Sequence, residues 1–128
     1  SDEIERVRNQ ARRRREVHDQ RLLTELRGES SQIDAINAII DELNNGLRSR
    51  VSGLIQLRSE GNPTSRIEAI DFVIGNLGMI RSAEESFRSE LTDEQIERLG
   101  DDAVNPFAYL DEEVVQLFHT LTTSSAMP

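Results

Sequence analysis

Apolar residues in the middle of the chain recur at intervals of three and four. Starting at Ile33, such steps lead to Ile36, Ile40, Leu43, Leu47, Arg50, Leu54 and Leu57. Arg50 is the single polar member of this row. The heptad-like stripe predicts a long amphipathic helix, with Ser31 and Asp34 at its start in a variant of the capping box and Gly61 just beyond its end.

A second stripe follows the Gly61-Asn62-Pro63 turn. Its members are Ile67, Ile70, Ile74, Leu77, Ile80, Ala83, Phe87 and Leu91, with Val73 and Met79 beside them. Asn62 is suited to cap this helix, and Pro63 is suited to its first position. Because the connection is short, the two helices are expected to be antiparallel neighbours whose stripes face each other. We therefore predict that residues 29–91 form a helical hairpin at the core of the protein.

Residues 1–28 form an arginine-rich segment with helical propensity and an interrupted apolar pattern. Apolar residues have helical spacing as far as Ala11, but Arg14 and His18 occupy the next positions. Such a helix gains little from burial on its own. We expect it to project from the hairpin or to join an oligomer through its ends.

The C-terminal part of the chain, residues 92–121, is expected to form acidic helices that begin after Thr92, followed by a flexible tail at residues 122–128. The last helix has one apolar face, formed by Val114, Leu117, Phe118 and Leu121. Two arrangements of this face are open. It folds back onto the hairpin, or it docks into a groove of another subunit.

The hairpin carries more apolar residues than a single contact between two helices buries. We therefore expect an all-α fold: a long antiparallel, coiled-coil-like hairpin with flanking N- and C-terminal helices, assembled into an oligomeric bundle. The residues expected at an oligomer or partner interface are Ile39, Leu43, Leu47, Val51, Ile55, Val73, Met79, Val114, Leu117 and Phe118.

Glycines interrupt both hairpin helices, at Gly46 and Gly53 in the first and at Gly75 and Gly78 in the second. In a helix interior each glycine costs about 1 kcal/mol relative to alanine. Either they permit close packing between helices or between chains, or they mark kinks.

Charge is unevenly distributed along the chain. The net charge is −9, and all 15 basic residues are arginine. The first 27 residues carry a small positive excess, whereas the segment from Thr92 onward has eight acidic residues and only Arg98 as a base. These two ends are expected either to dock on each other between subunits or to recruit different partners. The overall acidity argues against a dedicated nucleic-acid-binding protein.

The four consecutive arginines, Arg12, Arg13, Arg14 and Arg15, are the candidate contact for nucleic acid or for an acidic partner. The short stretch resembles the arginine-rich helices with which some viral and phage peptides bind structured RNA. The neighbouring acids and the absence of interleaved aromatic residues favour a solvated helix instead. In that case Arg12 pairs with Glu16 and Arg15 pairs with Asp19.

No motif in the sequence indicates a catalytic, cofactor or metal site. Cysteine is absent, which removes disulfides and cysteine-based zinc sites. The two histidines, His18 and His119, have no partner at metal-ligand spacing, and no run of apolar residues is long enough to span a membrane. We expect a non-enzymatic protein without cofactor, located inside a cell, or in the host cytoplasm or virion if it is viral.

These observations favour a structural, assembly or scaffolding protein that acts through helix-mediated oligomerisation, a class that includes viral and phage components. A homo-oligomer is the expected assembly, and a different protein partner is also compatible with the sequence. The first alternative is a small acidic regulator that binds a basic, nucleic-acid-handling protein. The second is an RNA binder that uses the arginine-rich helix.

Overall fold

The computed structural model describes residues 1–123, which are all-α, with five α-helices, two 3₁₀ helices and no strand. The elements are α1 (Asp2–Glu25), α2 (Ser30–Ser59), α3 (Arg66–Glu90), α4 (Asp93–Leu99), η1 (Asp101–Val104), η2 (Pro106–Tyr109) and α5 (Glu112–Thr123). The predicted all-α class is confirmed. The predicted tail begins within α5, and its residues 124–128 lie outside the described part of the chain.

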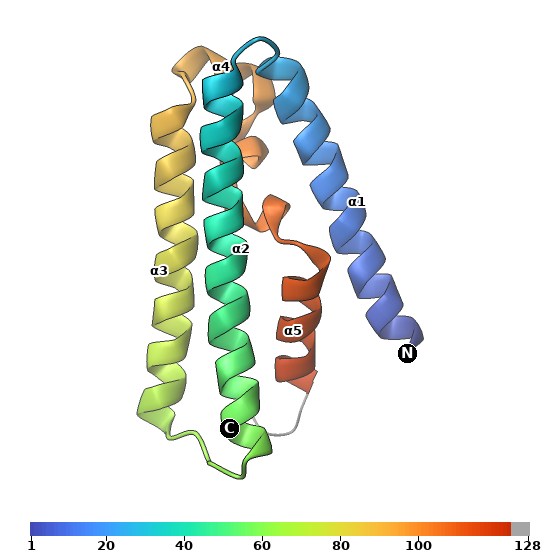
Figure 1. The fold of residues 1–128 in the computed structure, drawn as a ribbon, viewed down its shortest axis with the longest axis vertical. Helices are drawn as coiled ribbons and strands as arrows, with labels where there is room; N and C mark the ends of the chain where they lie inside the picture. The colour runs from blue at the N-terminus through green and yellow to red at the C-terminus, as the bar shows by residue number, and fades with distance from the viewer. Residues whose placement is uncertain (124–128) are drawn as a thin grey trace.

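Helices α2 and α3 make the most extensive contact between any two elements of the fold, and they run side by side in opposite directions (Figure 1). α2 ends where Gly61 adopts a φ of +82°, a conformation that glycine reaches without steric cost. This confirms the predicted end of the first hairpin helix. Its predicted capping box is absent, because α2 already begins at Ser30 and its N-cap residue, Glu29, makes no side-chain cap.

Helix α3 begins three residues later than predicted from Asn62 and Pro63. Its N-cap is Ser65, whose hydroxyl accepts a hydrogen bond from the Glu68 backbone N–H at 3.1 Å. The Glu68 carboxylate in turn accepts from the Ser65 N–H at 3.3 Å. This reciprocal box satisfies two backbone donors at the start of the helix and defines where α3 begins.

Helix α1 packs against α5, η2 and α4 (Figure 1). The expectation that it projects from the hairpin is therefore wrong. Ala11, Leu22 and Leu26 are buried in these contacts. Sparse apolar residues suffice because arginines of α1 also bond to the C-terminal part of the chain, as described below.

The core has two connected parts along the helical pair. The first lies where α4, η1 and η2 cover one end of the pair, and its centre is the fully buried ring of Tyr109, 5.2 Å from that of Phe87. The second lies where α5 packs on α2, and it includes Leu47, Leu110 and Val114. The segment that follows α3, from α4 to α5, thus covers one side of the hairpin.

Two of the helical glycines permit close packing, as one of the sequence interpretations proposed. A Cβ atom at Gly46 would collide with the terminal methyl group of Met79, and one at Gly75 would collide with the guanidinium group of Arg50. At Gly53 and Gly78, no atom of residues 1–123 outside the helix itself lies within 4 Å of the corresponding position. In each of the first two cases the glycine admits a side chain of the facing helix.

Candidate interaction surface

The first half of α3 presents a row of aliphatic side chains to solvent. The exposed fractions are 72% for Ile67, 49% for Ile70, 45% for Val73, 62% for Ile74 and 55% for Leu77. We call these five residues the α3 ridge. Single exposed aliphatic residues are common, but a contiguous group of this kind indicates an interaction site.

The ridge contains the first members of the stripe that was predicted to face α2, so that prediction is wrong for this half of α3. An α-helix turns about 100° per residue, and a step of three residues falls about 60° short of a full turn. The successive steps from Leu77 to Ile80 and from Ile80 to Ala83 therefore rotate the stripe around the helix. Ala83 is buried, whereas Ile67 and Ile74 point outward.

The inner side of the same half-helix is held by Arg50 of α2. Its Nε donates to the Oδ1 atom of buried Asn76 at 2.8 Å, and its Nη2 donates to the Phe72 carbonyl at 3.3 Å. The guanidinium carbon lies 5.7 Å from the centroid of the Phe72 ring. Arg50, the one polar residue in the α2 stripe, thus provides a hydrogen-bond donor for the side-chain oxygen of buried Asn76. The first half of α3 therefore has an inner face bonded to α2 and a second, apolar face that no described element covers.

An apolar groove of about 420 Å³ adjoins the ridge. We call it the α3–α5 groove. Its lining residues are Arg14, Leu47, Phe72, Val73, Asn76, Leu77, Ile80, Phe107, Leu110, Val115, Phe118, Leu121 and Thr122. Helices α3 and α5 both pack on α2 and supply the two walls, α2 contributes Leu47, and η2 contributes Phe107. Val73 and Leu77 belong to both the ridge and the groove, so the two form one continuous apolar surface.

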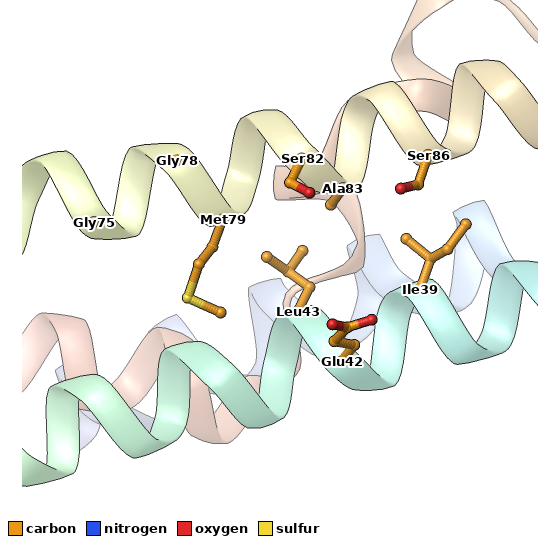
Figure 2. A pocket seen from close by; sticks show the side chains of 9 residues that line it. All are labelled: Ile39, Glu42, Leu43, Gly75, Gly78, Met79, Ser82, Ala83 and Ser86. Atoms are coloured by element: carbon orange, nitrogen blue, oxygen red, sulfur yellow. The ribbon is translucent and has the colours of Figure 1, made fainter.

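A second cavity, of about 310 Å³, opens between α2 and α3 (Figure 2). Met79 extends from α3 toward α2 beside Leu43, and the glycines Gly75 and Gly78 leave the neighbouring stretch of α3 without side chains. Glu42 and two serines make this cavity more polar than the α3–α5 groove. It provides space into which Met79 can move.

Charged contacts between α1 and α5 hold the two ends of the chain together. Arg8 and Arg12 each approach the Glu112 carboxylate to 2.5 Å, and Arg8 also donates to Gln116. The hydrogen bond from Arg12, followed in size of effect by that from Arg8, lowers the pKa of Glu112 to about 2. At the other end of α1, Arg98 of α4 binds both carboxylate oxygens of Glu25. Opposite charge in the two ends of the sequence thus produces docking within one chain.

His18 lies against the buried aromatic centre of the fold. Its ring packs edge-on against Tyr109, with 5.8 Å between centroids. Burial, together with the nearby positive charge of Arg21, lowers the pKa of His18. Burial raises the pKa of Tyr109, whose hydroxyl donates to the Ala103 carbonyl at 2.5 Å. Both groups are therefore neutral near pH 7 and serve the packing of α1.

The residues predicted at an interface fall into three groups. The buried ones are Leu43, Leu47, Val51 and Val114, the half-buried ones are Ile39, Ile55, Met79, Leu117 and Phe118, and the exposed one is Val73. The buried group contacts its own chain. Sequence reasoning did not assign Ile67, Ile70, Ile74, Leu77 and Phe107 to an interface, although a half-helix that is apolar on two faces is a signal for a second contact.

The arginine run is divided between different contacts. Arg12 binds Glu112 instead of the predicted Glu16, while Arg15 makes the predicted pair with Asp19 at 3.3 Å. Within residues 1–123, Arg13 and Arg14 make no ion pair. The run does not present four free cations together, which weakens the case for an RNA-binding helix.

Among the described residues, no three histidine, aspartate or glutamate side chains converge to hold a metal ion. No described helix combines the length and apolar character that crossing a bilayer requires. Comparisons with protein-family models, with curated proteins and with solved structures found no match to this chain.

Proposed function

We propose that the protein is a non-enzymatic assembly subunit that associates with copies of itself through the α3 ridge. The exposure of five neighbouring aliphatic residues on one helix is the observation that carries this proposal. The five side chains offer on the order of 400 Å² of apolar surface, comparable with the largest patches that monomeric proteins expose. Covering this surface supplies the free energy for association.

Salt distinguishes apolar association between copies of the chain from charge-driven association with a basic partner. The chain has a net charge of −9, so copies repel one another in dilute salt. Added salt screens this repulsion without weakening apolar contacts. A complex with a basic partner, which would use exposed acids such as Asp93, Glu94 and Glu97, would instead weaken as salt rises. The two functions therefore predict opposite responses to salt.

The test is the mass of the full chain in solution, measured by sedimentation across a range of micromolar concentrations at low and high salt. We expect an oligomer that persists or strengthens at high salt. Ile74→Glu should raise its dissociation constant at least tenfold, because it places a carboxylate where association would bury an aliphatic group. Val17→Glu is the matched control, since Val17 is 57% exposed on α1 and belongs neither to the ridge nor to the lining of the α3–α5 groove. A wild-type chain that remains monomeric under all these conditions contradicts the proposal.

A further inference from the structure

We propose that the α3–α5 groove of one copy receives the α3 ridge of a second copy, and that the two copies exchange this contact reciprocally. This inference rests on the proposed function and names the surface that accepts the ridge. The groove has the components that a helix-binding site needs: two helical walls, a residue from a third helix, and apolar lining along its length.

The groove fits a ridge of aliphatic residues in its chemistry. Of its described lining residues, ten are apolar, and the polar ones are Arg14, Asn76 and Thr122. Asn76 is buried, and its side-chain oxygen already accepts a hydrogen bond from Arg50. None of the described lining residues is acidic, although acids outnumber bases 24 to 15 in the chain. The groove lining therefore presents no carboxylate to an incoming ridge.

Reciprocity favours a second copy over a different partner. Because Val73 and Leu77 belong to both ridge and groove, a copy that inserts its ridge also brings its own groove next to the ridge of the first. Each partner then buries both surfaces in one twofold contact. A standard interface buries about 800 Å² on each partner, and the ridge alone supplies about half of this. The groove walls supply apolar surface for the remainder.

Disulfide trapping tests the contact directly, because the chain has no cysteine of its own. Ile74 lies in the middle of the ridge, and Thr122 lies at the rim of the groove on α5. An equimolar mixture of full-length Ile74→Cys and Thr122→Cys chains should form a disulfide-linked dimer of the two variants under mild oxidation. A mixture of Ile74→Cys with Glu94→Cys, placed on exposed α4, should form at least tenfold less of its mixed dimer.

A second pair of variants tests the groove without introducing cysteine. Thr122→Arg places a long cation across the groove, whereas Thr123→Arg makes the same change at the next residue, which is exposed and does not line it. We expect Thr122→Arg to raise the dissociation constant at least fivefold and Thr123→Arg to leave it within twofold. Circular dichroism checks that both variants keep their helix content.

The outcomes separate this inference from the proposed function. If the wild-type chain self-associates but Ile74→Cys and Thr122→Cys cross-link no better than the α4 control, and both arginine variants associate alike, the ridge binds another surface. The groove inference is then overturned while the assembly function stands. If the wild-type chain is a monomer throughout, both proposals fail.

Discussion

The side-chain oxygen of Asn44 accepts a hydrogen bond from the backbone N–H of Asp111 at 2.8 Å, although the two residues are 67 positions apart. The amide nitrogen of Asn44 donates to the Tyr109 and Ile40 carbonyls, both at 3.0 Å. Asn44 is 3% exposed, so it binds the backbone on both sides of Leu110 within the core. This one side chain fixes the point at which the chain leaves η2 and enters α5.

Asn44→Ala should destabilise the fold by about 3 kcal/mol, because it leaves a buried carbonyl and a backbone N–H without partners. Urea unfolding followed by circular dichroism measures this change. Asn45→Ala is the control. Exposed Asn45 accepts a hydrogen bond from the neighbouring Arg48, so its replacement should cost under about 1 kcal/mol. Equal effects of the two substitutions would show that Asn44 does not hold the entry to α5.

Acid should weaken the contact between α1 and α5. The pKa of Glu112 falls from its usual 4.5 to about 2 in the folded chain, so its charged form stabilises the fold above pH 4.5. This contribution is lost as the pH falls through the folded value. Glu112→Gln should therefore lower the melting temperature at pH 7, and its difference from wild type should shrink steadily toward pH 2.

The comparison for Glu112 is Glu5→Gln, a change to an exposed acid on α1 that makes no ion pair within the described chain. It should leave the melting temperature nearly unchanged at pH 7. A Glu112→Gln deficit that stays constant down to pH 2 would contradict the ionic role of this carboxylate.

His18 should titrate below its usual value of 6.5, because burial beside Tyr109 disfavours the charged ring. Above pH 6.5 the ring is neutral in both the folded and the unfolded chain. As the pH falls below 6.5, the unfolded chain takes up a proton at His18 before the folded chain does, so the stability of the fold declines. Nuclear magnetic resonance of the ring protons gives the pKa directly. His18→Gln should also flatten the pH dependence of stability just below pH 6.5. A His18 pKa at or above the usual value would show that the ring is solvated.

Gly53→Ala should stabilise the protein by about 1 kcal/mol, because Gly53 lies inside α2 and an added methyl group contacts none of the neighbouring elements in the described part of the chain. Gly46→Ala should gain less than this, since the methyl group must displace the end of Met79 toward the cavity beside it. Urea unfolding of both variants measures the two effects. A larger gain at Gly46 than at Gly53 would contradict the packing of Met79 described here.

The periodic pattern of the sequence predicted the long helical pair and its turn, since both depend on local spacing and on glycine. It misplaced the start of α3 because Asn62 and Pro63 compete with the capping box of Ser65 and Glu68, a signal that was present in the sequence. The uneven charge predicted that the two ends of the chain could dock on each other between subunits, but local patterns did not indicate that α1 docks within its own chain. That docking depends on Arg8 and Glu112, which are 104 residues apart, and nothing near either residue indicates its partner.

The candidate surface was only partly predictable for a related reason. The pattern showed that the hairpin has surplus apolar residues, and it placed Val73 among those at an interface. It could not decide which apolar face of α3 meets α2, because Ile74 and Ile80 look alike in a hydropathy pattern. Which face meets α2 depends on contacts between residues far apart in the sequence, such as the hydrogen bond from Arg50 of α2 to Asn76 on the inner face of α3.

The burial of Tyr109 gives the protein an internal optical probe. The chain has no tryptophan and no other tyrosine, so nearly all of its ultraviolet emission comes from this one ring. The ring lies between His18 and Phe87, where α1, η2 and α3 meet, and it is fully shielded from water. Its emission should therefore report the detachment of α1 from the bundle, while association at Ile67 and Ile74 leaves it unchanged. Unfolding and assembly can thus be followed by separate signals in the unlabelled protein.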